Sequence, residues 1–97
     1  MAAGDWKEML IAAQNGDLEL VKYHINMGEN PNYQHPEFLT TPLIESATFG
    51  HLEIVQFLLD HDADPSIRAG FSSDTALSMA KQNKHRVVVK LLKKYRK

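Results

Sequence analysis

Apolar residues occur along the chain in short blocks with helical spacing. From Leu52 to Leu59 they form a stripe broad enough to pack against neighbours on two sides. Glycine, proline and polar residues interrupt the pattern between blocks, and such residues mark turns and loops. The pattern predicts three pairs of helices, with first helices near residues 6–14, 42–49 and 76–83 and second helices near 18–27, 52–61 and 86–95.

The pattern repeats with a fixed period, so that position 47 in the second copy corresponds to position 13 in the first. Alanine, glycine, leucine, glutamate and valine of residues 13–21 recur in the same columns of residues 47–55, and a further step of equal length takes His51 to His85. Each helix pair is too thin to close a core alone, so the copies must stack on one another. We therefore expect a single domain over residues 1–97, with repeats at approximately 5–38, 39–72 and 73–97.

The predicted helices have start signals. Thr41 can cap free backbone N–H groups with its hydroxyl, and Pro42 suits the first helical position, where its missing N–H would have had no partner. Asp5 and Glu8 have the spacing of a capping box, with aspartate in place of serine or threonine. These signals support helix starts at the beginning of the first and second copies.

Glycines separate the two helices of the first two copies. Gly16 and Gly50 permit the left-handed backbone of a tight turn. Lys84 occupies the same position in the third copy. Because a left-handed backbone would cost a lysine about 1 kcal/mol, we expect this turn to be built differently.

Small side chains mark the places where helices of adjacent copies approach closely. The residues concerned are Ala12, Ala13, Ser46, Ala47 and Ala80. A bulky side chain at Ala47 is therefore expected to destabilise the stack through overpacking.

The central copy carries a diagnostic motif. Thr41-Pro42-Leu43 opens its first helix, Gly50-His51-Leu52 joins the two helices, and Ala63-Asp64-Pro65 follows the second. This series resembles the ankyrin repeat, and the shared period extends the resemblance over nearly the whole chain. The resemblance implies an all-α solenoid of three helix-turn-helix repeats with β-hairpin-like fingers, the first and last repeats acting as caps. It also implies a protein-binding module that uses the fingers and the inner face of the first helices.

The two expected fingers depart from the family pattern. Residues 32–41 and 66–75 are one residue longer than the usual spacing, and the family's glycine two places before the threonine is Leu39 in one finger and Ser73 in the other. We expect Gly70 to take over the positive-φ position in the second finger.

The exposed columns of the first helices and the fingers supply the candidate partner contacts. Phe49 is the notable member, because an aromatic side chain at a recognition column can anchor a partner. Packing of finger against finger is the alternative role for the finger aromatics. The predicted partner-binding residues are Tyr33, His35, Phe38, Glu45, Thr48, Phe49, Arg68, Phe71, Gln82 and Asn83.

Charge is divided sharply along the chain. Residues 1–80 carry a net charge of −9 and residues 81–97 carry +8. Clustered lysines release counterions when they meet phosphates, so binding of an anionic ligand, nucleic acid or acidic lipid, is an alternative function for the basic C-terminal helix. A solvated cap explains the same charge, since Arg86 stands where the family has a buried leucine and Lys93 where the other copies are apolar. We favour the cap, because only Tyr95 could stack on a base there.

No motif points to catalysis, a cofactor or a metal. Asp60, Asp62 and Asp64 mimic the opening of a calcium loop, but Pro65 stands where its turn glycine belongs. The histidines have no metal-ligand spacing, and the resemblance implies a structural role for those that follow the turns. Phosphate-loop, dinucleotide and nucleophile-elbow patterns are absent from the sequence, so we expect a non-enzymatic protein without cofactors.

Composition sets the remaining limits. Of the 97 residues, 43% are apolar and 24% charged, which excludes a mainly disordered chain, and the absence of cysteine excludes disulfides. No apolar run approaches the roughly 18 residues needed to cross a bilayer, and no leader pattern opens the sequence. We expect a cytoplasmic monomer whose partner is another protein.

Overall fold

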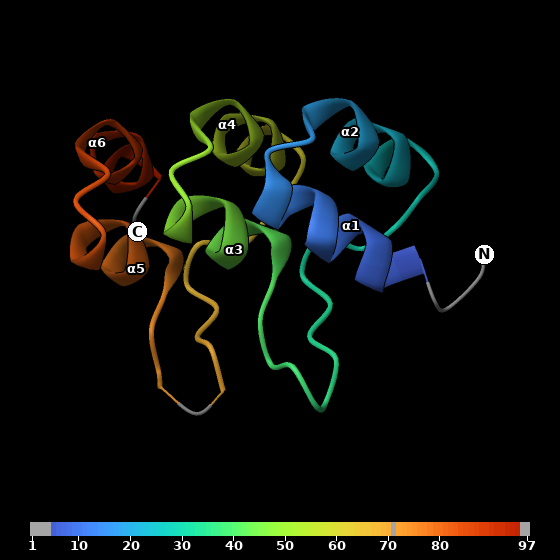
Figure 1. The fold of residues 1–97 in the computed structure, drawn as a ribbon, viewed down its shortest axis with the longest axis horizontal. Coiled ribbons are helices and arrows are strands. Elements are labelled where there is room, and N and C mark those ends of the chain that lie inside the picture. Colours follow the sequence, from blue (N-terminus) through green and yellow to red (C-terminus); the bar gives the residue numbers. More distant parts are fainter. Residues whose placement is uncertain (1–4, 71, 96–97) are drawn as a thin grey trace.

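The computed structural model describes residues 5–70 and 72–95, except for the side chain of Asp5. Six helices follow one another in these residues: α1 (Asp5–Asn15), α2 (Leu18–Asn26), α3 (Pro42–Thr48), α4 (Leu52–Asp60), α5 (Ala76–Gln82) and α6 (Arg86–Lys94). The inner helices α1, α3 and α5 form one layer and the outer helices α2, α4 and α6 form a second (Figure 1). Two loops, finger 1 (residues 27–41) and finger 2 (residues 61–75), project from the inner layer. The predicted all-α stack of three repeats is confirmed.

Threonine caps start the inner helices of the second and third repeats. The Thr41 hydroxyl accepts a hydrogen bond from Ile44 N–H at 3.2 Å, and a proline follows at the first helical position. Thr75 accepts from Ser78 N–H at 3.2 Å, and the Ser78 hydroxyl accepts in return from Thr75 N–H at 2.8 Å. The cap predicted at Thr41 is confirmed, whereas the capping box predicted at Asp5 involves a side chain outside the described residues.

The fingers are hairpin-shaped but contain no β-strand in the residues that the structure describes (Figure 1). A few turn hydrogen bonds stand in place of the implied β-hairpins. In finger 2, Ala69 N–H donates to the Asp74 carbonyl at 2.7 Å, and between the fingers Gly70 N–H donates to the Leu39 carbonyl at 3.0 Å. The two fingers therefore support each other at a point of close backbone approach.

Positive φ angles lie at the two finger positions where the family has glycine. Leu39 has a φ of 52° and Ser73 a φ of 60°. The expectation that Gly70 would take this role is wrong, because its φ is not positive. Glycine is needed at position 70 for a different reason: a Cβ there would lie 2.6 Å from the Cβ of Leu39.

A glycine turn and a histidine from the next repeat join successive repeats. Gly16 and Gly50 have φ angles of 79° and 76°. His85 Nε2 donates to the Thr48 carbonyl at 3.0 Å, and His51 makes the equivalent bond to the first repeat at 2.9 Å. The structural role implied for both histidines is confirmed.

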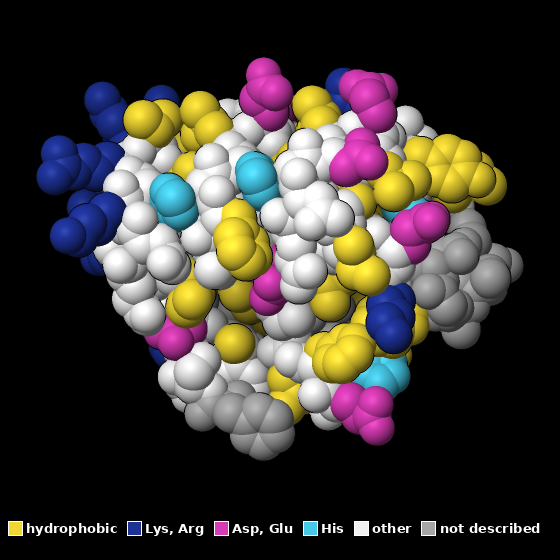
Figure 2. Space-filling view, viewed as in Figure 1, with side chains coloured by type: hydrophobic (Ala, Val, Ile, Leu, Met, Phe, Trp, Pro, Cys, Tyr) yellow, Lys and Arg dark blue, Asp and Glu magenta, His cyan; other side chains and the backbone are white. Residues whose placement is uncertain are grey.

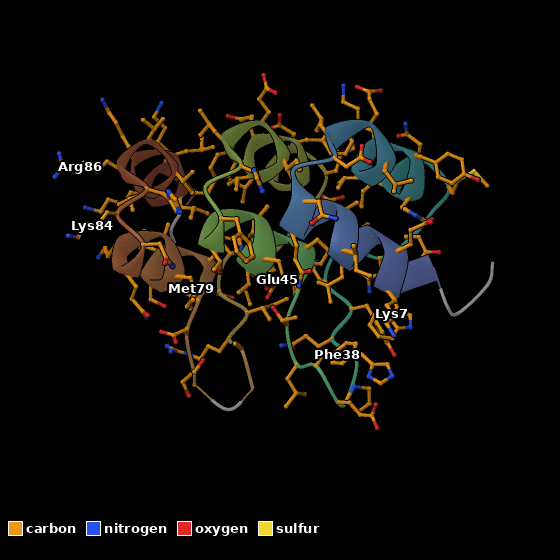
Figure 3. All side chains as sticks on the ribbon, in the orientation of Figure 1. Lys7, Phe38, Glu45, Met79, Lys84 and Arg86 are labelled. Carbon is orange, nitrogen blue, oxygen red and sulfur yellow. The ribbon has the colours of Figure 1, made fainter. Side chains whose placement is uncertain are left out.

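Lys84 completes the same turn without a glycine. Its φ is 61°. His85 N–H donates to the Ala80 carbonyl at 2.9 Å, as His51 N–H does to the Ser46 carbonyl at 2.9 Å. The expectation of a different turn is therefore wrong. The residues described include no fourth repeat whose histidine would occupy the space beside Lys84, and its side chain points away from the stack (Figure 3).

Replacing Lys84 by glycine is expected to raise the free energy of unfolding by about 1 kcal/mol, because glycine adopts a positive φ without the steric cost of a Cβ. Urea denaturation of the purified chain measures the change. As a control, Lys81→Gly removes the same charge inside α5 and should lower the stability by about 1 kcal/mol. No gain at position 84 would contradict backbone strain at this turn.

Small residues line the contacts between the inner helices. Each of the following is no more than 2% exposed: Ala12, Ala13, Ser46, Ala47 and Ala80. Larger apolar side chains of the outer helices, among them Val55 and Leu58, complete a core that all three repeats share. The core holds the inner helices at a fixed spacing, and this spacing sets the geometry of the surface in front of them.

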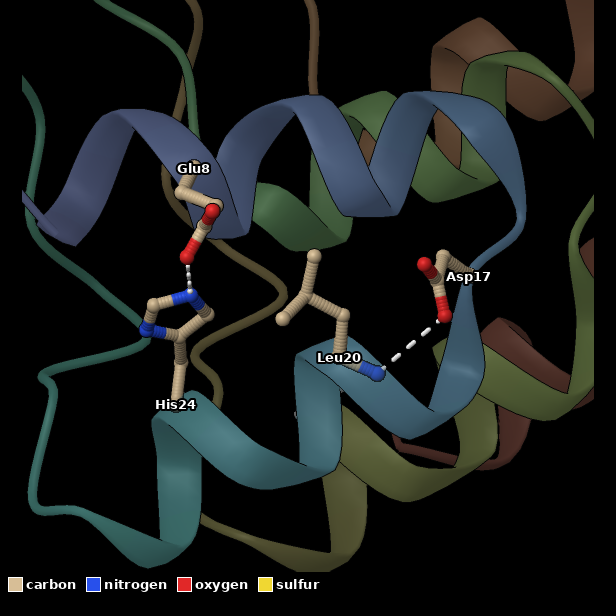
Figure 4. Close-up of polar contacts among 4 residues, drawn as sticks. All are labelled: Glu8, Asp17, Leu20 and His24. Atoms are coloured by element: carbon tan, nitrogen blue, oxygen red, sulfur yellow. Dashed lines mark hydrogen bonds and ion pairs between the residues drawn. The ribbon is translucent and has the colours of Figure 1, made fainter.

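One polar pair interrupts the core of the first repeat. The repeat period places His24 in the column of Leu58 and Leu92, and its side chain is 1% exposed. His24 Nε2 donates to Glu8 Oε1 at 2.8 Å and so joins α2 to α1, while Asp17 caps the start of α2 (Figure 4). The first repeat thus uses a hydrogen bond where the other two use leucine.

Candidate partner-binding surface

The exposed side of the inner helices and the adjoining sides of the fingers form one surface, the inner face. Figure 2 shows hydrophobic side chains spread among polar ones across it. Three columns recur along this face with the repeat period, namely Ile11, Glu45 and Met79, then Gln14, Thr48 and Gln82, then Asn15, Phe49 and Asn83.

Phe49 is the most exposed large apolar side chain of the described inner face. It follows the last residue of α3, and 53% of its surface is exposed. Its ring packs against His51, with the ring centroids 6.4 Å apart. His51 is itself hydrogen-bonded to the Gln14 carbonyl of the first repeat, so the ring that Phe49 packs against is held in place. Its exposure agrees with the register of the repeat, and its role in binding stays a prediction.

Glu45 lies at the centre of the inner face, half-buried on α3 (Figure 3). Gln14 Nε2 donates to its Oε1 at 3.0 Å, and the Thr40 hydroxyl donates to its Oε2 at 2.8 Å. One donor comes from α1 and the other from the base of finger 1, so the carboxylate is fixed from two sides. Both donors are neutral, and no cation of the described residues lies within ion-pair distance of this carboxylate.

Three other predicted contacts are tied to their own repeats. The Thr48 hydroxyl and the Asn83 amide each donate to the carbonyl four residues earlier, at 2.7 Å and 2.9 Å. Gln82 reaches the base of finger 2 and donates to Asp74 Oδ1 at 2.9 Å. Gln82 and Asn83 are exposed and Thr48 is half-buried, so the first two are better placed to meet a partner.

Tyr33, His35 and Phe38 of finger 1 gather around Trp6 of α1. Trp6 stacks on His35, with ring centroids 4.3 Å apart. Its ring also lies 5.5 Å from Phe38 and 5.9 Å from Tyr33. The described ring contacts of these aromatics are with α1 and within finger 1. Tyr33 and Phe38 remain 43% and 47% exposed beside the inner face.

Sequence reasoning misses two residues of this surface, Trp6 and Ile11. Trp6 has no aromatic counterpart one period later, where Thr40 stands, so the repeat carries no signal for it. Ile11 is 45% exposed and shares a column with Glu45, so the period could have marked it.

Arg68 is the predicted contact of finger 2 that the structure describes. It is exposed, and its Nη1 donates to the Ser73 carbonyl at 3.0 Å. Gln34 of finger 1 donates to the Arg68 carbonyl at 2.8 Å and ties the two fingers together. Phe71, the other predicted contact, lies outside the described residues.

A basic surface covers one end of the stack (Figure 2). Its exposed members are Lys81, Lys84, Arg86, Lys90, Lys93 and Lys94. Lys93 meets solvent where Leu59 is buried, as a capping repeat requires. Burial in the column of Arg86 is only partial, because Leu18 is half-buried and Leu52, which begins α4, is 37% exposed.

Asp60, the last residue of α4, links this helix to Tyr95 at the end of α6. Asp60 accepts from the Tyr95 hydroxyl at 3.1 Å and from Gln56 Nε2 at 3.0 Å. In the part of the chain that the structure describes, no group of three or more histidine, cysteine, aspartate or glutamate side chains is arranged to hold a metal ion. None of the described helices is both long and apolar enough to cross a membrane.

A family model described as ankyrin repeats, in three copies, matches residues 9–97. The chain belongs to the ankyrin-repeat family. It is 43% identical over 70 residues to the human DNA-binding protein RFXANK, a match that covers 72% of this chain and 26% of that protein. It is also 29% identical over 86 residues to the ARF GTPase-activating protein Git of Drosophila melanogaster, covering 89% of this chain and 12% of that protein.

A solved structure has a similar ankyrin-repeat fold. It is a chain from the complex of the Bd0816 predatory endopeptidase of Bdellovibrio bacteriovorus with immunity protein Bd3460, with a TM-score of 0.82 and 33% identity, covering 89% of this chain and 44% of that chain. The chain spans about a quarter or less of the length of these two curated relatives. Ankyrin repeats are generally protein–protein interaction modules, and the family is typically non-enzymatic.

Proposed function

We propose that this ankyrin-repeat chain binds a protein partner on the inner face, with Phe49 as the central anchor and the fingers as flanking contacts. The observation that carries the proposal is an aromatic side chain, 53% exposed, at the middle of a rigid stack. Aromatic anchors of this kind dominate the free energy of many protein interfaces. The module would act as an adaptor, scaffold or inhibitor, as a cytoplasmic monomer with repeat boundaries near residues 38 and 72.

The surroundings of Phe49 favour a protein over a small ligand. Ile11 of α1 and Phe38 of finger 1 add exposed apolar area to this face, and Figure 2 shows polar side chains among the hydrophobic ones. Interfaces between proteins have this mixture of apolar anchors and polar rim. The solved relative of this fold comes from a protein–protein complex, which supports the same class of partner.

The basic end supports the anionic-ligand alternative less well. Single-stranded nucleic acid is held by stacking on aromatic side chains as well as by charge. Tyr95 is the one aromatic residue of the described C-terminal segment 81–95, and it is half-buried with its hydroxyl bonded to Asp60. The exposed lysines there are accounted for by a solvated cap.

Replacing Phe49 by alanine is expected to weaken partner binding by about tenfold or more, because truncating an anchor aromatic typically costs at least about 1 to 2 kcal/mol. Affinity capture with the wild-type chain, followed by mass spectrometry, supplies the partner, and titration calorimetry measures both affinities. The melting temperature should stay nearly unchanged, since about half of the ring is in solvent.

Tyr23→Ala is the matched control, because Tyr23 is 55% exposed on outer helix α2. It should capture the same proteins with unchanged affinity. Equal binding by the wild-type chain and the Phe49 variant would refute the inner face as the site. A large loss of stability in that variant would instead assign Phe49 to the core.

A further inference from the structure

We propose that the inner face selects a protein segment that presents an arginine next to an apolar residue, and that Glu45 is the carboxylate that receives the arginine. This inference rests on the proposed function, because it assumes that the inner face is where a protein binds. It adds the chemistry of the partner, which the family as a whole does not determine.

The Glu45 carboxylate is already oriented in the unbound chain. Gln14 donates to one oxygen at 3.0 Å and Thr40 to the other at 2.8 Å. A carboxylate oxygen can accept two hydrogen bonds, so each oxygen keeps one acceptor position. Because side-chain freedom is already lost in the unbound chain, a partner that bonds to Glu45 bears less of the cost of ordering it.

The charge of Glu45 is not neutralised by a cation of the described residues. Its two donors are neutral groups, and the basic side chains of the fingers and α1 are engaged elsewhere. Lys7 lies over the Phe38 ring (Figure 3), with its Nζ 5.8 Å from the ring centroid. Arg68 donates to a carbonyl of its own finger at 3.0 Å. A half-buried carboxylate with neutral donors can form an ion pair with a cation of a partner. A guanidinium can reach both oxygens with a planar pair of N–H donors.

Apolar side chains lie on the inner face around the Glu45 carboxylate. Ile11 and Met79 flank Glu45 in its own column, and Phe49, the C-cap of α3, follows it by four residues. Residues four apart are neighbours on a helix surface. The planar guanidinium can stack on an aromatic face while its alkyl stem and a neighbouring apolar side chain cover Ile11 or Phe49. Arginine fits this frame better than lysine, whose compact ammonium is more strongly hydrated.

The uneven distribution of charge along the chain also favours a basic partner. Residues 1–80 carry a net charge of −9, whereas the basic end beyond them carries +8. A basic segment is therefore attracted to the first two repeats and repelled from α6, which favours approach to the centre of the inner face. The same field disfavours phosphorylated and acidic segments at Glu45.

The experiment uses the full chain and a phage-displayed library of random short peptides. Peptides are selected on the wild-type chain, and those that lose binding to Phe49→Ala are retained as ligands of the inner face. We expect these to be enriched in arginine adjacent to an apolar residue. For a synthesised peptide of this set, Glu45→Gln should weaken binding by about tenfold or more, since charge-assisted hydrogen bonds are roughly twice as strong as neutral ones. Glu53→Gln, the same charge change at an exposed position of outer helix α4, should change it by less than about twofold.

A change in the peptide keeps the test independent of protein stability. Replacing the arginine by citrulline, its uncharged isostere, should cost about as much as Glu45→Gln, and the two changes together should cost little more than either alone. Ligands of the inner face that lack arginine, or that are indifferent to both changes, would overturn this inference and leave the proposed function standing. A selection in which no peptide depends on Phe49 would overturn both.

Discussion

Alanine in place of Gly50 is expected to lower the free energy of unfolding by about 3 kcal/mol, because two costs add. Gly50 has a φ of 76°, and a left-handed backbone costs a residue with a Cβ about 1 to 2 kcal/mol. The new Cβ would also lie 2.5 Å from His85 Nδ1, and such overpacking costs about 1 to 3 kcal/mol. The ring cannot move away without losing its bond to the Thr48 carbonyl at 3.0 Å.

Gly28 provides the control for the backbone term. Its φ is 96°, and a Cβ built there meets no atom within 4 Å. Gly28→Ala should therefore lose only the conformational part, about 1 to 2 kcal/mol, in the same urea denaturation. Equal losses at positions 28 and 50 would show that the His85 ring does not occupy the space beside the turn.

The regular period of the sequence explains why the helices could be predicted closely. The segment 42–49 was expected to be helical and α3 spans Pro42–Thr48, because threonine, proline and glycine mark its ends. Where each copy repeats the same local signals, local and global preferences agree, and prediction is reliable. The exposure of Phe49 followed from the same register, since all three members of its column, Asn15, Phe49 and Asn83, are exposed.

The backbone of the finger bases and of the third turn could not be predicted from residue preference. Leu39, Ser73 and Lys84 all have positive φ, although glycine is the usual residue there. The preference is worth about 1 kcal/mol per residue, and the hydrogen bonds that link repeats outweigh it. Gly70 was the residue with the right intrinsic freedom, yet the close approach of Leu39 decides its role.

The aromatic cluster of finger 1 could not be predicted because it does not follow the period. Trp6 meets His35 and Phe38 from the opposite end of the first repeat, and the other repeats have no equivalent. The hydrogen bond from Thr40 to Glu45 has the same origin, since it depends on how the base of finger 1 turns toward α3. Contacts specific to one repeat therefore give the first repeat a surface that the other two do not share.

Leucine in place of Ala47 is expected to cost about 3 kcal/mol, toward the upper end of the range typical of overpacking. Ala47 is fully buried on α3, which packs against α1 on one side and α5 on the other. The added carbons cannot be accommodated by a shift toward either neighbour without opening the other contact. Urea denaturation measures the loss, and Lys81→Leu, which adds a leucine at an exposed site on α5, should change stability by less than about 0.5 kcal/mol.

The same variant links the core to the binding surface. If the inner helices are forced apart, the three residues of the column Ile11, Glu45 and Met79 move away from one another. Gln14 of α1 can then no longer reach Glu45 at 3.0 Å. Peptides that bind the inner face should therefore bind Ala47→Leu more weakly at a urea concentration and temperature where the variant is still folded, as judged by circular dichroism. Undiminished stability would mean that α3 has room beside Ala47. Lower stability with undiminished peptide affinity would mean that the spacing of the inner helices does not control the surface in front of them.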